Sequence, residues 1–342
     1  MEKDYNIQLN TDKKYIKKLS IWPKVAIVIV NWNNYHATKR CLESLRNISY
    51  PNYRIYLIDN NSQDSSGKKL YIKFSSNNIV FIFNNKNLGF AGGCNEGIRK
   101  ALDEGYDYIL LLNNDCIVHD KEFLKNGISL AESNIDCGVV GGKILFWPNT
   151  KTIWSTGGYI TYLSGEKHIG HKEIDRGRYN TVEKRQFISG ALMLIKRRVF
   201  EKIGLLPDVY FFGKEEWEFS QRALKFGFQL YYCPIFSVYH EASNSHEWKD
   251  LTYVYNGTLS KILFKKRNLT KNGFRIWFFL YKAYLNFFFH IRYSLYSTKY
   301  LQGVSPYLLR RVMLDAVKDS SNVDKITEDM LDNYRRSKLT KM

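Results

Sequence analysis

Four short apolar segments in the first 115 residues each end in a cluster of asparagine and aspartate, and this repeated pattern constrains the fold most. Apolar runs of this length are typical of strands buried on both faces of a parallel sheet. The stretches between them carry helical spacing, so strands and helices should alternate. The four apolar segments are Val25–Val30, Arg54–Ile58, Ile79–Phe83 and Tyr108–Leu112.

The alternation predicts an α/β fold with a mostly parallel sheet, right-handed crossovers and flanking helices. The carboxyl ends of parallel strands meet at one edge, and ligands of open α/β sheets bind beyond that edge. We therefore expect the polar clusters after the four strands to form one site. They begin at Asn31, Asp59, Asn84 and Asn113.

The fourth cluster, Asn113-Asn114-Asp115, carries the clearest chemical signal. A lone carboxylate beyond a strand end suits a divalent cation that holds phosphate oxygens. Taken alone, the three residues are equally well explained as a turn or cap. The three neighbouring polar clusters favour the ligand site.

A second unusual stretch, Tyr210 to Phe219, combines Glu215, Glu216 and Glu218 with aromatic side chains of the kind found at surfaces. It opens a predicted helix that continues to Gly227. Acidic residues in a first helical turn complement the helix dipole, which is a purely structural explanation. Three carboxylates beside these aromatic residues are more than a cap requires, so we favour a functional role.

Other elements are predicted beyond Asp115, where the alternation loosens. The predicted helices are Lys121–Glu132 and Val199–Ile203, and the predicted strands are Cys137–Phe146, Gln186–Ile195, Gln229–Cys233 and Phe236–Val238.

The net charge of +18 indicates an anionic partner: nucleic acid, nucleotide or an anionic bilayer. Eleven Lys and Arg but no Asp or Glu occur from Lys261 to Arg311, amid many aromatic residues. Within this span, a helix over Phe274–Tyr296 would carry a narrow polar stripe and a wide aromatic face. Charged side chains interrupt it, so we expect an interfacial helix on an anionic membrane, not a membrane span. The stripe is Lys282, Asn286 and His290, and the interrupting residues are Lys282 and Arg292.

Packing of the aromatic face on the sheet domain, or on a second copy of the protein as a homo-oligomer, is the alternative to membrane binding.

The predicted organisation is an extension at 1–23, a sheet domain at 24–248 and a helical, basic region at 249–342. Five cysteines without a C-x-x-C pair argue against zinc and disulfides and favour a reducing compartment. The first 23 residues lack the apolar core of a signal peptide, so we expect a cytoplasmic protein.

Seven short motifs follow one another in a recognisable order. They are Val-Asn-Trp-Asn, Ile-Asp-Asn-Asn-Ser, Asn-Leu-Gly-Phe-Ala-Gly-Gly-Cys-Asn, Leu-Asn-Asn-Asp, Ser-Gly-Ala-Leu-Met, Phe-Gly-Lys-Glu-Glu and His-Glu-Ala-Ser. In this order the chain, from Lys24 to Ser245, resembles inverting glycosyltransferases of the Rossmann-like GT-A fold, the family 2 type. Within that family it resembles bacterial rhamnosyltransferase-like enzymes of surface-polysaccharide assembly.

The resemblance implies that Asp115 and His240 hold a divalent metal, Mn²⁺ or Mg²⁺, that bridges the donor diphosphate. The family more often has a carboxylate at Asn113, so the metal here would receive less charge. Glu216 falls on the position of the catalytic base, where the family more often has Asp. The donor would be bound by Asn31, Asp59, Gly92, Gly93, Asn113, Asn114, Gly190 and Ala191, and the acceptor by Glu215, Trp217 and Glu218.

The implied reaction moves a sugar, with rhamnose the leading single candidate, from a UDP or dTDP donor. The implied acceptor is lipid-linked or a polysaccharide, at the inner face of the bacterial cell membrane. In an inverting transfer, a carboxylate removes the acceptor hydroxyl proton and a metal stabilises the leaving diphosphate.

Two other functions stay open. Charge and aromatic residues together are compatible with nucleic-acid binding, but they lie outside the sheet domain and form no known reading motif, so we expect no nucleic-acid partner. The amide at Asn113 is compatible with a nucleotide-sugar-binding protein without catalysis. Neither a Walker loop nor G-x-G-x-x-G is present, which disfavours kinases and dehydrogenases.

Overall fold

The computed structural model describes residues 22–76, 78–161, 165–241, 251–288 and 305–339. Most of the expected N-terminal extension lies outside these ranges. The expected domain boundary at residue 248 and the final part of the predicted aromatic helix, including His290 and Arg292, also lie outside them.

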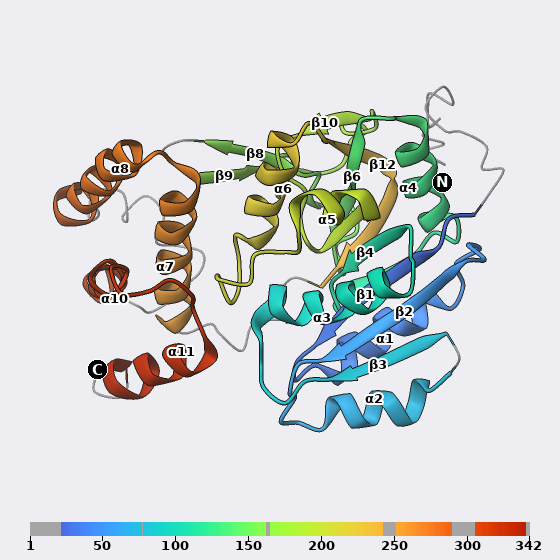
Figure 1. The fold of residues 1–342 in the computed structure, drawn as a ribbon, viewed down its shortest axis with the longest axis horizontal. Coiled ribbons are helices and arrows are strands. Elements are labelled where there is room, and N and C mark those ends of the chain that lie inside the picture. Colours follow the sequence, from blue (N-terminus) through green and yellow to red (C-terminus); the bar gives the residue numbers. More distant parts are fainter. Residues whose placement is uncertain (1–21, 77, 162–164, 242–250, 289–304, 340–342) are drawn as a thin grey trace, which may run out of the picture.

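The four N-terminal strands form a parallel group, as predicted. They pair in the order β4-β1-β2-β3. The register sets Asn31 opposite Asp59 and Asp59 opposite Phe83, so the polar clusters that follow these strands come to one edge of the sheet (Figure 1). The strands are β1 (Val25–Asn31), β2 (Tyr53–Asp59), β3 (Ile79–Phe83) and β4 (Tyr108–Leu112).

The second half of the chain extends this group into a ten-stranded mixed sheet. β11 (Leu192–Lys196) runs antiparallel between β4 and β6 (Cys137–Phe146). β12 (Gln229–His240) lies parallel to β6, and β10 (Glu183–Arg185) pairs antiparallel with β12 at the sheet edge. Two short strands, β5 (Cys116–Ile117) and β7 (Ile153–Ser155), pair with β12 and β6, and β8 (Gly158–Thr161) and β9 (Gly165–His168) form a separate hairpin.

Two predicted strands differ from the structure. The strand predicted from Gln186 begins only at Leu192. The two short strands predicted after Gly227 are one strand, β12, whose register shifts between Cys233 and Ser237. Pro234 lies in this interval and has no N–H to donate to the ladder, so the bulge keeps the strand continuous.

Helices cover both faces of the sheet. Along β1, Val25, Ile27 and Ile29 pack on one helix layer, while Ala26 and Val28 pack on the other. This alternation explains why every residue of β1 before Asn31 is apolar. The first layer is α1 (Tyr35–Leu45), α2 (Ser66–Phe74) and α4 (Phe123–Ser133); the second is α3 (Gly89–Asp103), α5 (Arg197–Ile203) and α6 (Glu215–Lys225).

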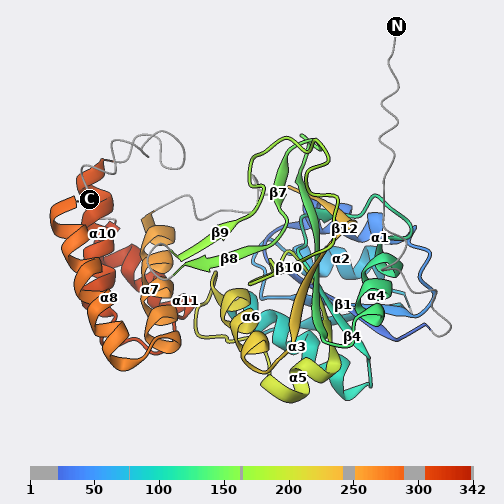
Figure 2. The same cartoon turned by 90° about the horizontal axis from the view of Figure 1, so that it is seen from above.

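The C-terminal helices are packed against the sheet domain at α6. One apolar cluster joins Tyr210, Phe211 and Trp217 to side chains of α7, α10 and α11. The β8–β9 hairpin reaches α7 in the view from above (Figure 2), where Lys265 Nζ donates to the Thr161 carbonyl at 3.2 Å. The elements are α7 (Leu251–Asn268), α8 (Lys271–Ala283), the π-helical η2 (Tyr284–Phe288), α10 (Pro306–Asp319), α11 (Glu328–Tyr334) and η3 (Arg335–Leu339).

Among the described residues, no helix has the length and apolarity needed to cross a membrane. The predicted aromatic helix is divided between two environments. Trp277 and Tyr281 pack inside the C-terminal region, while Ile276, Phe279 and Phe287 are exposed. The alternative of packing therefore describes one face of α8, and the other face stays available to a partner.

Candidate active site

The polar residues after β1 and β2 form one buried hydrogen-bond network. The Asn31 amide donates to Asp59 Oδ1 at 2.8 Å, to Ser66 Oγ at 2.9 Å and to Ser62 Oγ at 3.1 Å. Its carbonyl oxygen accepts from the Thr38 hydroxyl at 2.8 Å. Asn31 is fully buried, so its side chain orients Asp59 and offers no surface of its own to a ligand.

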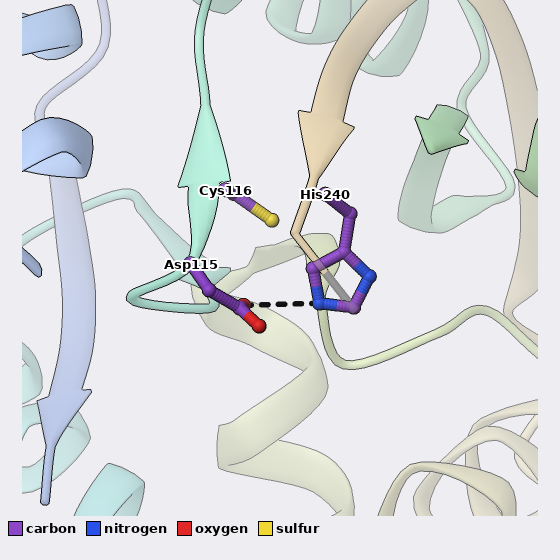
Figure 3. A group of neighbouring side chains, drawn as sticks. All are labelled: Asp115, Cys116 and His240. Atoms are coloured by element: carbon purple, nitrogen blue, oxygen red, sulfur yellow. Dashed lines mark ion pairs between the residues drawn. The ribbon is translucent and has the colours of Figure 1, made fainter. Parts of the chain in front are cut away.

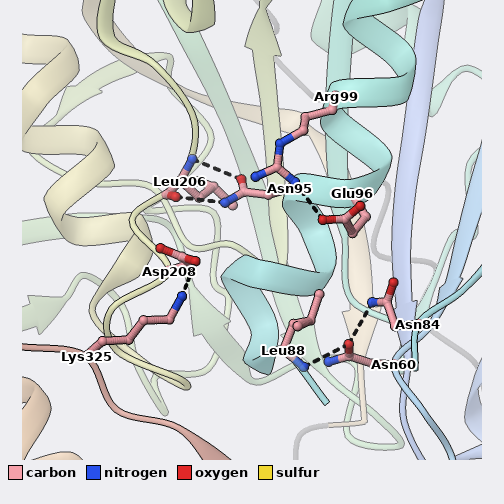
Figure 4. A network of polar contacts seen from close by, with 9 residues as sticks. All are labelled: Asn60, Asn84, Leu88, Asn95, Glu96, Arg99, Leu206, Asp208 and Lys325. Carbon is pink, nitrogen blue, oxygen red and sulfur yellow. Dashed lines mark hydrogen bonds and ion pairs between the residues drawn. The ribbon is translucent and has the colours of Figure 1, made fainter. Parts of the chain in front are cut away.

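A second amide, Asn60, joins the ends of β2 and β3 to the start of α3 (Figure 4). Its Oδ1 accepts from Asn84 Nδ2 at 2.9 Å and from the Leu88 N–H at 3.2 Å, and its Nδ2 donates to Asn87 Oδ1 at 2.7 Å. The polar clusters are therefore joined, as the sequence predicted. Asn60 and Asn87 were missed as individual residues, although both stand in the polar clusters that the sequence singled out.

The predicted glycines have different surroundings. Gly93 lies inside α3, where an added Cβ would come within 3.1 Å of the Val30 side chain. Gly92 also lies in α3, and an added Cβ would come within 2.7 Å of Leu88 Cβ. Gly93 thus serves the close packing of α3 on β1. An added Cβ at Gly190 would instead lie 3.8 Å from the Cβ of Glu216.

Left-handed residues other than glycine gather in the loops of this region. Asn33, Asn61 and Ser65 have φ of 49°, 63° and 61°, and Phe211 and Lys214, just before α6, have φ of 58° and 92°. Such conformations cost free energy and are found preferentially at functional sites. Asn33 and Asn61 stand in the polar clusters that follow β1 and β2, and Phe211 and Lys214 stand in the Tyr210–Phe219 stretch.

Asp115 and His240 meet at the sheet edge although they come from distant parts of the chain (Figure 3). Both side chains are buried, and Asp115 Oδ1 lies 3.0 Å from His240 Nε2. Pairing of β5 with β12 sets Cys116 opposite His240, and the Glu241 N–H donates to the Asp115 carbonyl at 2.9 Å. The backbone therefore fixes this pair.

The Asp115–His240 pair fits a shared divalent ion. Two ligand atoms bound side by side at about 2.1 Å from one ion are about 3 Å apart, which matches their spacing. Asn113 Nδ2 lies 3.4 Å from His240 Nε2, and within the described chain its buried Oδ1 has no hydrogen-bond partner. Asn113 could therefore supply a neutral oxygen ligand.

Cys116 also belongs to this group, since the ligand atoms of Asp115, Cys116 and His240 all lie within 4.8 Å of one another. Burial, aided by the Asp115 charge, raises the pKa of the Cys116 thiol well above its ordinary value. The thiol donates to the Ala191 carbonyl at 3.5 Å. Because this sulfur is already hydrogen-bonded to the Ala191 carbonyl, we take Asp115 and His240 as the ligands and Cys116 as their neighbour.

A chain of aromatic rings extends from His240 to α6. The Trp154 ring stands edge-on to His240, 4.6 Å between centroids, and His168 contacts both Trp154 and Phe187. Phe187 in turn lies 5.9 Å from Trp217. Sequence analysis assigned no role to Trp154 or His168, because both come from strands too short to show a periodic pattern.

His168 is a neutral member of this chain of rings. Desolvation, helped by the charges of His171 and Lys214, lowers its pKa to about 4. Its Nδ1 lies 2.8 Å from the Ser155 hydroxyl, which fixes the ring plane. The imidazole is therefore an uncharged member of the ring chain between Trp154 and Phe187.

The three carboxylates of α6 have different environments. Glu215 and Glu218 are buried, whereas Glu216 is partly exposed beside Gly190. The neighbouring Ala191 carbonyl accepts from the Asn113 N–H at 3.2 Å, so one short loop joins Glu216 to the Asp115 cluster. The Gly190–Ala191 loop therefore lies beside Glu216 on one side and contacts Asn113 on the other.

Glu215 and Glu218, which the resemblance assigns to the acceptor, are both buried in this structure. Burial raises the pKa of Glu215. Burial also opposes ionisation of Glu218, but hydrogen bonds from Arg267 and Tyr210 outweigh it and lower its pKa. Arg267 binds both Glu218 oxygens, at 2.8 and 2.9 Å. Trp217 is buried too, with the Lys214 ammonium 3.7 Å from its ring centre.

Replacing Arg267 with alanine should lower the free energy of unfolding by roughly 1–3 kcal/mol, because a buried charged acceptor loses its donor. Arg267 is 44% exposed, so solvent screening keeps the loss below that of a fully buried pair. The lowered pKa of Glu218 means that this stabilisation is present above the ordinary pKa of glutamate and is lost as pH falls.

Urea unfolding at neutral and acidic pH measures this effect. The exposed Arg275, replaced by alanine, is the matched control. Equal losses for both variants, or a loss that does not shrink in acid, would contradict the role of the Arg267–Glu218 pair.

The C-terminal helices also reach the other end of the site. Asn87 Nδ2 donates to Glu328 Oε1 at 3.2 Å, and the Ile326 N–H donates to the Val209 carbonyl at 2.9 Å. Lys325 pairs with Asp208 (Figure 4). The C-terminal region therefore contacts both the Asn60 network and the base of α6.

The amino-acid sequence is similar to those of several named transferases. It is 26% identical over 226 residues to a low-salt glycan biosynthesis hexosyltransferase of Haloferax volcanii, covering 63% of this chain and 66% of that protein. It is 26% identical over 255 residues to a dolichyl N-acetyl-alpha-D-glucosaminyl phosphate 3-beta-D-2,3-diacetamido-2,3-dideoxy-beta-D-glucuronosyltransferase of Methanococcus voltae, covering 71% and 74%. The chain spans less than two thirds of some relatives, such as 64% of a second Haloferax volcanii glycosyltransferase.

The fold also matches a solved structure of a mannosyltransferase from Pyrobaculum calidifontis in complex with GDP-Man and Mn²⁺. The TM-score is 0.52 at 12% identity, over 90% of this chain and 92% of that one. This likeness confirms the predicted GT-A-like α/β fold. The family model of glycosyl transferase family 2 matches residues 26–204, more than half of the 342 residues. The chain therefore belongs to glycosyl transferase family 2.

Proposed function

We propose that the protein transfers one sugar from a nucleotide donor to a glycan acceptor, with inversion at the anomeric carbon. The observation that supports this proposal is the buried Asp115–His240 pair at the sheet edge, together with the Gly190–Ala191 loop, which lies beside Glu216 and accepts a hydrogen bond from the Asn113 N–H. Metal ligands and a carboxylate base from separate chain segments suit a displacement in which they act on opposite sides of the sugar.

The donor half of the site would use the polar network. Asp59, fixed by Asn31, is placed for a hydroxyl or base contact, and Asn114 is held by the Thr38 hydroxyl at 2.8 Å. Asp115 and His240, with Asn113 as a neutral oxygen donor, would hold the divalent ion. The imidazole ligand favours Mn²⁺ over Mg²⁺. When bound, such an ion stabilises negative charge on the leaving diphosphate.

The acceptor half would use Glu216. Its carboxylate takes the proton from the acceptor hydroxyl as that oxygen bonds to the anomeric carbon and the bond to the diphosphate breaks. Trp154, His168 and Phe187 form the chain of ring contacts between His240 and Trp217, the neighbour of Glu216 on α6.

The proposal also names a class of donor and a class of acceptor. We favour a UDP or dTDP sugar, with rhamnose the leading single candidate by resemblance. A lipid-linked or polysaccharide acceptor in bacterial surface-polysaccharide synthesis, at the inner face of the cell membrane, fits best. A hexosyltransferase and a transferase named for a dolichyl phosphate sugar among the relatives support a glycan acceptor.

A screen of UDP-, dTDP- and GDP-sugars with and without Mn²⁺ tests the proposal. We expect one donor to release its nucleoside diphosphate, slowly to water and faster with acceptor, and only with the metal. Donor binding without any release in the presence of glycan acceptors would instead support a binding protein without catalysis. Absence of both binding and release would overturn the proposed function.

A further inference from the structure

Helix α8 exposes one continuous apolar stripe. Ile276, Phe279, Leu280 and Phe287 are 60, 68, 48 and 74% exposed. Spacings of three and four residues, continued through the turn of η2, set them on one side of the helix. Four large apolar side chains grouped on one exposed side mark an interaction surface.

The opposite side of α8 is anchored, so the stripe cannot turn inward. Trp277, Tyr281 and Leu285 are buried together with Ile262 of α7 and Leu309 of α10. The rings of Trp277 and Tyr281 stack at 5.0 Å between centroids. The orientation of the stripe is therefore set by the fold.

A row of cations flanks the stripe. Lys271, Arg275 and Lys282 are exposed, and their spacings of four and seven residues place them beside the stripe along the helix. No acidic residue occurs between Lys261 and Arg311. The surface is thus apolar along its centre and cationic along one side.

An apolar stripe beside a row of cations fits an anionic bilayer better than a second copy of the protein. An anionic bilayer accepts apolar side chains at the boundary of its acyl chains and cations among its headgroups. A second copy docked stripe to stripe would crowd two basic rows, with no acidic residue in the segment to pair them. We propose that the α8 stripe and its basic row are the surface by which the protein lies on an anionic membrane.

The proposal stands apart from the proposed sugar transfer, because it concerns binding alone. Its geometry does relate to that function, since α7 joins α8 to α6 through the Arg267–Glu218 pair.

Flotation of the full-length protein with vesicles tests the surface. We expect binding to phosphatidylcholine vesicles that contain phosphatidylglycerol, and weak binding to phosphatidylcholine alone. Replacing Phe279 and Phe287 together with serine should reduce partitioning by about tenfold or more, because two large side chains no longer leave water. Replacing Arg275 and Lys282 with glutamine should remove the preference for anionic vesicles and the salt dependence.

Matched controls separate the stripe from general apolarity. Ile72 and Ile135 are also exposed but lie on the sheet domain, and their double serine variant should bind vesicles like the wild type. Point substitutions are preferable to deletion from Phe274, which would also remove Val312 and Ala316 from the cluster shared with α6. Circular dichroism and melting confirm that each variant is folded.

Three results would overturn the proposal. In the first, the Phe279/Phe287 double variant floats with vesicles as well as the wild type does. In the second, the wild-type protein binds neutral and anionic vesicles equally. In the third, no form of the protein binds vesicles, and the wild type is a dimer that the double variant converts to a monomer. The last result would assign the stripe to a second copy. Release of nucleoside diphosphate by the same variants keeps the proposed function separately testable.

Discussion

Glu216→Gln is expected to slow sugar transfer by about 10²–10⁴-fold while donor binding stays close to that of the wild type. The amide keeps the size of the side chain but cannot accept the acceptor proton. Glu216 is the partly exposed carboxylate of the α6 start, and it lies beside Gly190, which the structure joins to the Asp115 cluster. Transfer to one acceptor and calorimetric donor binding measure the two effects.

The two neighbouring carboxylates are the controls for this variant. Glu215 is buried, so we expect its amide variant to retain measurable turnover. Glu218→Gln breaks the ion pair with Arg267 and should lower stability more than turnover. Near-normal transfer by Glu216→Gln removes the residue from the mechanism, and a loss confined to Glu215→Gln would move the base by one position.

Asp115→Ala should abolish the part of donor binding that depends on Mn²⁺, a loss of more than about 100-fold, since changes to groups that merely support metal ligands already cost 10–100-fold. The residue follows the end of β4, so the sheet should stay intact. Calorimetry with and without Mn²⁺ measures binding, and circular dichroism checks the fold.

Cys116→Ala is the matched control for Asp115→Ala. Its sulfur lies in the same group of side chains, but its thiol donates a hydrogen bond to the Ala191 carbonyl. We expect it to retain Mn²⁺-supported donor binding. Unchanged donor affinity in Asp115→Ala, or an equal loss in Cys116→Ala, would refute the assignment of the ion to the Asp115–His240 pair.

The sequence by itself determined the parallel half of the sheet and the edge at which the site lies. Buried parallel strands must be apolar on both faces, so the four strands can be recognised in the sequence as apolar segments of five to seven residues each. Because parallel strands end at one edge, the clusters at Asn31, Asp59, Asn84 and Asn113 could be placed together without knowing any distance.

The pattern of apolar residues along the sequence predicted the antiparallel and very short strands less well. β5, β7, β8, β9 and β10 span two to four residues, too few to show a period. Trp154 and His168 come from such strands, so only the structure places their rings in the chain of contacts that begins at His240.

Tertiary structure alone decided which carboxylate of α6 is available. Glu215, Glu216 and Glu218 look alike in sequence, but Arg267, 49 residues beyond Glu218, makes Glu218 an internal ion-pair partner. Likewise, packing of Trp277 and Tyr281 on α7 and α10 decided which side of α8 faces outward. The physical reason is that hydrophobic period and turn chemistry are local, whereas burial, charge pairing and pKa depend on contacts between segments that only the folded chain brings together.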